Sequence, residues 1–202
     1  NYCTALTSVT IPVSGTSIGA FAFSSCTSLT SVSIGSGVDS IGDHAFSYCS
    51  ALTSVSIPDG VTTINAYAFV VCTSLTSVSI GSGVDSILSD AFRGCYRLTS
   101  ITFYGKIAPT SIGTDWILET PSTIRGHAYV DSNFPAPGYV WHGLTFGTVI
   151  FTPEHNYTYS VSGGQATITH YIGAGGAVNI PSTLGGYPVV ALADWSFTKC
   201  YL

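Results

Sequence analysis

Residues 3–103 repeat at a fixed interval of 23 residues, and no other feature constrains the fold as strongly. Four apolar columns recur at this interval: Cys3, Cys26, Cys49, Cys72 and Cys95; Leu6, Leu29, Leu52, Leu75 and Leu98; Val9, Val32, Val55, Val78 and Ile101; Ile11, Ile34, Ile57, Ile80 and Phe103. A fixed period of roughly 20 to 50 residues is typical of a solenoid, in which each repeat forms one coil and buries its apolar side against its neighbours. The repeat therefore predicts a solenoid.

Each repeat is expected to contain a strand, a turn and a short helical turn. In the second repeat, Val32 and Ile34 lie two residues apart, which is the spacing of side chains on one face of a strand. A Gly or Pro turn follows, and a short extended stretch then brings Ile41 to the interior. Phe46 and Cys49 lie three residues apart, and this spacing predicts a helical turn with both side chains on one face.

The cysteines are expected to be buried thiols that act as small hydrophobic residues. A disulfide framework needs distinct partners, whereas the five cysteines of the column are interchangeable neighbours. A bridge between adjacent coils stays open, because a separation of about 5 Å between coils is near the range that disulfides accept.

The whole unit resembles the BspA-type leucine-rich repeat. It reads Cys-x-x-Leu-x-x-Val-x-Ile, a Pro or Gly turn, Val-x-x-Ile and Ala-Phe-x-x-Cys, and the resemblance covers residues 1–103. The resemblance implies a β-rich α/β fold, a right-handed solenoid with short helical turns. It also implies a bacterial protein that is secreted or displayed at the cell surface for adhesion. The asparagine ladder of many other leucine-rich repeats is missing, and cysteine stands in the column of small residues.

Three segments are predicted: residues 1–103 as the repeat array, 104–150 as its C-terminal cap, and 151–202 as a small antiparallel β meander. The period breaks after Phe103, and the following stretch is irregular and rich in aromatic residues and proline. An open coil needs a covering segment, and this stretch can provide it.

The last segment is expected to open a second, truncated array. Alternating residues on both sides of Gly163 and Gly164 predict a hairpin. Further on, Phe197 and Cys200 have the same spacing as the Phe and Cys of each earlier repeat.

Charge and hydropathy exclude two classes of partner. Charged residues make up 7% of the chain, against roughly 25% in an average soluble domain, and no basic run is present. The chain therefore lacks the basic patch that neutralises phosphates, and no nucleic-acid partner is expected. No apolar stretch approaches the roughly 18 residues needed to cross a bilayer, so no membrane insertion is expected within this chain.

No catalytic or metal site is expected. Residues 15–19 match the G-x-S-x-G pattern of serine hydrolases around Ser17. However, Ser17 occupies the same repeat position as Ser40, Thr63 and Ser86, so the repeat explains it better. The histidines show neither i, i+4 pairing nor the spacing to cysteines of a zinc site. We therefore expect a protein that is not an enzyme and uses no cofactor.

The candidate binding site is a strip of hydroxyl side chains between the buried strand residues. We expect it to line the concave sheet with Ser8, Thr10, Ser31, Ser33, Ser54, Ser56, Ser77, Ser79, Ser100 and Thr102. The strip could bind an extended protein segment or a glycan. The structural interpretation is favoured, in which short polar residues simply suit a curved, exposed sheet, because binding hot spots are usually Trp, Tyr or Arg and the strip has none.

The function predicted is non-catalytic binding to an extracellular or host protein, or to a protein of a neighbouring cell. A carbohydrate-binding module is the second hypothesis, with Trp116 and Trp141 as sugar-stacking candidates. A passive spacer within a larger surface protein is the third.

Overall fold

The computed structural model describes residues 2–129, 132–147, 157–171, 180, 182–184, 187–194 and 196–197. The chain divides into two compact units, Asn1–Val149 and Ile150–Leu202. Cys200, which the sequence pairs with Phe197 in the second repeat pattern, lies outside the described residues.

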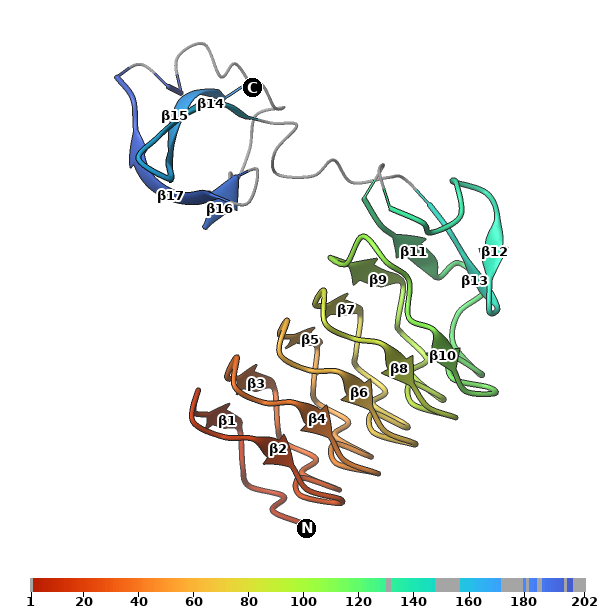
Figure 1. The fold of residues 1–202 in the computed structure, drawn as a ribbon. Helices are drawn as coiled ribbons and strands as arrows, with labels where there is room; N and C mark the ends of the chain where they lie inside the picture. Colours follow the sequence, from red (N-terminus) through yellow and green to blue (C-terminus); the bar gives the residue numbers. More distant parts are fainter. Residues whose placement is uncertain are drawn as a thin grey trace. The chain divides into compact units, whose positions relative to one another are not determined.

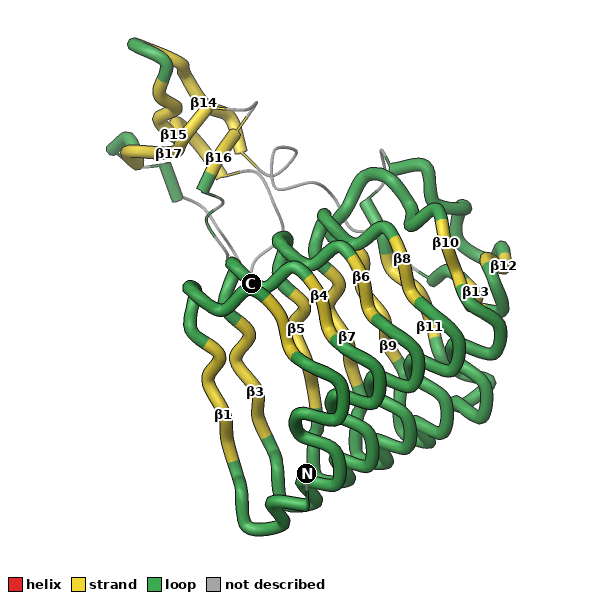
Figure 2. Tube along the Cα trace, turned by 60° about the horizontal axis from the view of Figure 1, so that its bottom comes forward, coloured by secondary structure: helices red, strands yellow, loops and turns green. Residues whose placement is uncertain are grey.

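The first unit is a stack of coils, and each repeat contributes one longer and one shorter strand (Figure 1). The longer strands are β1 (Ser8–Ile11), β3 (Ser31–Ile34), β5 (Ser54–Ile57), β7 (Ser77–Ile80), β9 (Ser100–Phe103) and β11 (Arg125–His127). The shorter strands are β2 (Ser17–Ile18), β4 (Ser40–Ile41), β6 (Thr63–Ile64), β8 (Ser86–Ile87) and β10 (Ser111–Ile112). Figure 2 shows the strands of successive coils side by side.

Strands of successive coils pair in parallel, with equivalent residues opposite each other. Val55 lies opposite Val78, and Ile57 lies opposite Ile80. The longer strands form the pair β1-β3 and the sheet β5-β7-β9-β11, while the shorter strands form one sheet in the order β2-β4-β6-β8-β10. The solenoid predicted from the period is confirmed, because the constant repeat length superposes like residues.

The core consists of continuous columns of identical side chains. Leu29, Leu52, Leu75 and Leu98 are all fully buried. The phenylalanine rings stack along the axis, with centroids 5.2 Å apart for Phe46 on Phe69 and for Phe69 on Phe92. Offset or stacked aromatic pairs add to the free energy of burying each ring. The Phe column therefore links the stability of each coil to that of the next.

We predict that Phe69→Ala lowers the free energy of unfolding by about 3–5 kcal/mol, the range for removing a buried ring. Phe69 is fully buried between two rings, so the substitution removes both stacking contacts and leaves a cavity. Urea unfolding of the whole chain measures the loss. Tyr67→Ala is the control, since Tyr67 is 37% exposed and its loss should be much smaller. Equal losses would contradict the column as a source of stability.

The predicted helical turn between Phe46 and Cys49 was wrong, since the described residues contain no helix. Three amides donate to carbonyl oxygens three residues back, those of Ala45, Ser47 and Cys49. The amides between them donate instead to the next coil, His44 to Ala66, Phe46 to Ala68 and Tyr48 to Val70. An α-helix requires every amide to bond within the same segment. The segment is therefore a series of tight turns whose alternate amides join neighbouring coils.

A left-handed backbone at two positions in each coil explains why the helix does not form. The first column is Phe21, His44, Tyr67 and Asp90, and the second contains Tyr2, Ser25, Tyr48, Val71 and Gly94. The φ values of these non-glycine residues lie between 54° and 61°. A single left-handed residue interrupts a right-handed helix, so each turn ends before the next begins.

We predict that Val71→Gly stabilises the protein by up to about 1 kcal/mol. A β-branched residue with a φ of 57° is strained, and this strain exceeds the entropy lost by introducing glycine. Gly94 holds the equivalent position with a φ of 70°, and a Cβ there would lie 3.2 Å from a methyl group of Val71. Gly94→Ala should therefore destabilise the protein. Thermal unfolding measures both changes, and shifts of the same sign would refute the strain argument.

The stack continues beyond Phe103, where the sequence period ends. β10 pairs in parallel with β8, and β11 pairs in parallel with β9. The interval is two residues longer here than in the array, as Ser111 lies opposite Ser86. The hairpin of β12 (Val140–Trp141) and β13 (Leu144–Thr145) follows, and Phe134, Trp141 and Phe146 all contact the ring of Phe103. The role of residues 104–150 as a cap stays a prediction.

The second unit is a four-stranded sheet in the order β14-β15-β17-β16. β14 (Tyr157–Ser162) and β15 (Gln165–Tyr171) form the expected antiparallel hairpin. β16 (Thr183–Leu184) pairs antiparallel with β17 (Tyr187–Leu192), whereas β17 pairs in parallel with β15. The sheet is therefore mixed, and only its hairpins follow the predicted meander.

The cysteine column consists of free thiols, and Cys26, Cys49, Cys72 and Cys95 are buried as expected, while Cys3 is exposed. The thiols of three of them donate to Phe carbonyl oxygens of the preceding coil: Cys49 to Phe23, Cys72 to Phe46 and Cys95 to Phe69, at 3.2–3.3 Å. Burial raises the pKa of Cys49 and Cys95 to about 12, and it raises the pKa of Cys72 well above its usual value. The thiols are therefore protonated and structural.

We predict that iodoacetamide at pH 8 labels Cys3 and leaves Cys49, Cys72 and Cys95 unmodified in the native protein. The thiolate is the reactive form, and both burial and the raised pKa suppress it. Peptide mapping by mass spectrometry identifies the labelled sites. In denaturant all of them should react. Labelling of Cys72 in the folded state at the rate of Cys3 would contradict the buried column.

Candidate functional site

The ten hydroxyl residues of the predicted strip lie on the outward side of the longer strands β1, β3, β5, β7 and β9. In β5 the outward Ser54 and Ser56 are exposed, while Val55 and Ile57 between them are buried. The six strip residues of β1, β3 and β5 are exposed, and those of β7 and β9 are half-buried: Ser77, Ser79, Ser100 and Thr102. Their part in binding stays a prediction.

The parallel register arranges the strip in two straight rows. Ser54, Ser77 and Ser100 form one row, and Ser56, Ser79 and Thr102 form the other. The same pairing places Ser8 opposite Ser31 and Thr10 opposite Ser33 at the other end of the array. Each coil thus presents two hydroxyl groups in the same orientation.

None of the ten strip hydroxyls makes a hydrogen bond within the described part of the chain. The neighbouring threonine column behaves differently. The hydroxyls of Thr30, Thr76 and Thr99 donate to backbone carbonyl oxygens of the preceding coil at 3.0, 3.0 and 3.3 Å. The threonine column therefore ties the coils together, whereas the strip hydroxyls remain available to water or a ligand.

β11 adds two residues to the strip that the sequence analysis missed. Arg125 lies opposite Ser100, and His127 lies opposite Thr102. The guanidinium group of Arg125 donates to the carbonyl oxygens of Ile124 at 2.8 Å and Ser122 at 3.3 Å. Both residues escaped the search for repeated positions because this last interval is two residues longer than the others. The strip thus ends in an arginine, a residue type enriched in binding hot spots.

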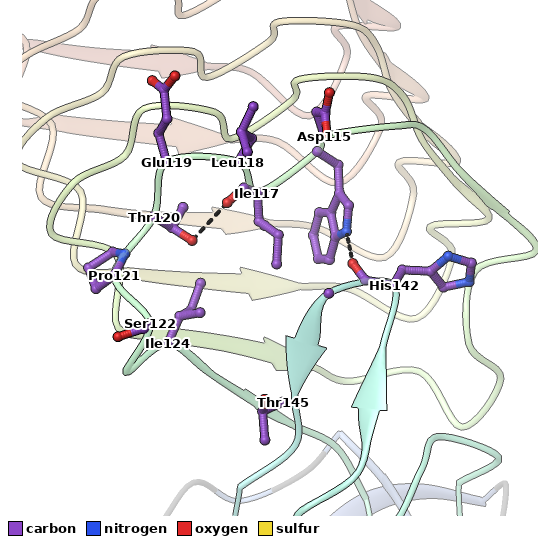
Figure 3. Close-up of a pocket in the computed structure, with 12 residues that line it drawn as sticks. Asp115, Ile117, Leu118, Glu119, Thr120, Pro121, Ser122, Ile124, His142 and Thr145 are labelled. Carbon is purple, nitrogen blue, oxygen red and sulfur yellow. Dashed lines mark hydrogen bonds between the residues drawn. The ribbon is translucent and has the colours of Figure 1, made fainter.

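A pocket of about 340 Å³ is lined in part by Ser122 and Ile124, which directly precede β11 (Figure 3). It lies between residues 115–124 and the turn of the β12–β13 hairpin. Its apolar lining includes Trp116, Ile117 and Ile124, and its hydroxyl groups are those of Thr120, Ser122 and Thr145. A pocket whose lining combines apolar side chains with polar groups can hold a small ligand.

Trp116 supports the pocket but offers little ring surface to a ligand, as it is 2% exposed. Its indole N–H donates to the carbonyl oxygen of His142 at 2.8 Å. Its ring meets Phe92 edge-on at 6.3 Å, so Trp116 continues the Phe column of the core. Trp116 is therefore a poor sugar-stacking candidate, whereas Trp141 is half-buried.

Glu119 at the pocket is held by an ion pair with Arg93. The guanidinium lies 2.9 Å from Glu119 and 3.4 Å from Asp90. The hydrogen bond and charge of Glu119, followed by the contact with Asp90, raise the pKa of Arg93. Figure 3 shows the carboxylates of Asp115 and Glu119 directed away from Thr145. The carboxylates therefore lie apart from the hydroxyl group of Thr145.

A stack of three partly exposed rings also escaped the sequence analysis. His44 lies between Phe21 and Tyr67, with both centroid separations 4.7 Å and near-parallel planes. The three residues hold the same position in successive repeats, which is the signal that could have found them. Because the rings cover each other's faces, the stack presents mainly ring edges to solvent.

Ser17 lies at a regular strand position of the repeat. It belongs to β2 and lies opposite Ser40 of β4, so its position follows the repeat. A nucleophile elbow places serine between a strand and a helix, and the part of the chain that the structure describes contains no helix. Within the same residues, no group of three His, Cys, Asp or Glu side chains could hold a metal ion, and no helix is long and apolar enough to cross a bilayer.

The repeat register, the parallel coils and the Leu and Phe columns define a leucine-rich-repeat solenoid. The family model of the BspA type leucine-rich repeat region matches residues 1–116 in six copies, and the chain belongs to this family. The matched residues extend past Phe103, as the pairing of β10 with β8 does.

Two solved structures are similar to this chain, and no curated protein matches it. The leucine-rich repeat protein of T. pallidum is 27% identical over 60% of this chain and 58% of its own, with a TM-score of 0.52. A leucine-rich cell surface protein of Faecalibacterium prausnitzii A2-165 is 27% identical over 95% of this chain and 58% of its own, with a TM-score of 0.45. The matches thus span 58% of each of these proteins.

Proposed function

We propose that this chain is a non-catalytic binding module, secreted or displayed at the cell surface, that recognises an extracellular or host protein. One observation carries the proposal. Ten outward hydroxyls stand in ordered rows on the pair β1-β3 and on the sheet β5-β7-β9-β11, and they make no hydrogen bond within the described residues. The proposal of secretion or surface display is supported by membership in the BspA-type family, a class of bacterial surface proteins.

The rows offer several hydroxyl groups to an extended protein segment. Neighbouring strands of a sheet lie about 4.8 Å apart, so each row offers hydroxyl groups at regular steps along the array. A single hydrogen bond contributes only about 0.5–1.5 kcal/mol, so affinity requires several bonds along the rows. Arg125 at the end of one row adds a charged donor that can bind a carboxylate of the partner.

A carbohydrate-binding module is the second candidate, and the pocket is the observation that favours it. Its volume of about 340 Å³ and its mixed lining of apolar side chains and three hydroxyl groups could accommodate a sugar unit. The third hypothesis, a passive spacer, predicts that neither the strip nor the pocket binds a ligand.

We predict that Ser33→Arg combined with Ser56→Arg weakens binding to a protein ligand at least tenfold. Both serines are exposed on the strip, and two long charged side chains would block contact with it. The measurement is surface plasmon resonance on immobilised extracellular-matrix proteins, including collagen and laminin, with a glycan array in parallel. Ser17→Arg combined with Ser36→Arg is the matched control, as both serines are exposed and lie outside the strip.

Three results would decide against the strip. Binding to no matrix protein or host cell would favour the spacer. Equal loss in both double variants would show that the strip is not the contact surface. Binding on the glycan array that Thr145→Arg abolishes, while the strip variant retains it, would replace the protein ligand by a carbohydrate in the pocket.

A further inference from the structure

The second unit reproduces the contacts of a repeat coil, although its sequence shares few residues with the array. Val189, Leu192 and Phe197 have the same spacing as Val61, Ile64 and Phe69 of the array. The segment that contains them can therefore be compared with the array contact by contact.

The strand pairing of the second unit matches that of the array. In β15 and β17, Ile168 lies opposite Leu192 in parallel, as Ile41 of β4 lies opposite Ile64 of β6. The amide after each of these strands bonds the same carbonyl group. The N–H of Ala193 donates to Ile168 at 2.8 Å, and in the array Asn65 donates to Ile41 at 2.9 Å.

The turn and the ring stack of the second unit also match those of the array. The amide of Tyr171 donates to Ser196, as the amide of Phe46 donates to Ala68. Tyr171 stacks on Phe197 with centroids 5.4 Å apart and planes 20° apart, and the Phe46–Phe69 pair has values of 5.2 Å and 5°. β15 with Tyr171 thus takes the place of a preceding coil, and β17 with Ser196 and Phe197 takes the place of the coil stacked on it.

The two sides of this coil differ in what covers them. β14 pairs antiparallel with the outer side of β15, so it closes the stack at that side. On the other side, β16 pairs only with Tyr187 and Pro188, and the N–H of Val189 donates to Ser182 at 2.8 Å. Beyond Val189, this edge of β17 pairs with no other strand among the described residues. Leu192 is 47% exposed, whereas its equivalent Ile64 is fully buried because coils lie on both sides of it.

We infer that the second unit is the front cap of a further leucine-rich-repeat array, and that the open side of β17, from Val190 to Leu192, binds a following coil of the same repeat. The occupant is defined by the coil interface of the first unit. It brings a two-residue strand to the edge beside Leu192, with an Ile packed on Leu192 and a Phe ring beside Phe197. Burial of Leu192 would complete the column that Ile168 begins.

The test changes the order of the two units. Cys200 and Cys3 hold the same position of the repeat, so residues 150–200 can be joined directly to residues 4–149. The first coil of the array then follows the second unit in the correct register. Leu192→Ser and the control Val190→Ser are made in this rearranged chain and in the chain of native order. Val190 corresponds to the exposed Thr62 and is itself 54% exposed.

In the rearranged chain, Leu192→Ser should lower the melting temperature by about 5 °C, since the substitution removes a newly buried leucine side chain. In the chain of native order, Leu192→Ser should lower the melting temperature by less than half as much. Val190→Ser should have little effect on the melting temperature of either chain. Hydrogen exchange of the amides of 190–192 should slow at least tenfold on rearrangement. Unchanged exchange, equal effects of Leu192→Ser in both chains, or failure of the rearranged chain to fold while the native order folds would each overturn the inference.

Discussion

Hydrogen bonding between coils is the interaction on which the rest of this structure depends. No coil can satisfy its own backbone: the strand amides and alternate amides of the turn segment find acceptors only in the neighbouring coil. This pairing fixes the register, and the register places Leu over Leu and Phe over Phe in the core. The thiol of Cys72 follows the same rule, because it donates to a carbonyl oxygen of the preceding coil. The regular stacking of the coils and the burial of their apolar side chains therefore both result from hydrogen bonding between neighbouring coils.

The columns of the core could be predicted from the sequence because a constant repeat length superposes like residues of successive coils. The helical turn could not. A spacing of three residues between Phe46 and Cys49 is common to a helix and to a series of tight turns. The difference lies in the intervening backbone, where His44 and Tyr48 adopt positive φ and alternate amides cross to the next coil. Side-chain spacing carries no information about where those amides donate.

The candidate site shows the same division. Alternation within the strands was sufficient to place Ser54 and Ser56 on the outer face, because that pattern is local. Arg125 and His127 occupy the same rows, but the longer interval before β11 hid them. The pocket depends on the β12–β13 hairpin folding back against residues 115–124, a contact between distant parts of the sequence that no periodicity encodes. The ring stack of Phe21, His44 and Tyr67 was missed because its members differ in chemistry while sharing one position.

The lengthened interval at the end of the array has a wider meaning for a protein built this way. Coils of identical sequence present identical surfaces, so a partner would bind each of them with the same affinity. A partner can recognise one particular position only where the regular repeat is interrupted. In this chain the break brings Arg125, His127 and the pocket to the same end of the array. Two additional residues in one coil thus make one end of the repeat array different from the rest.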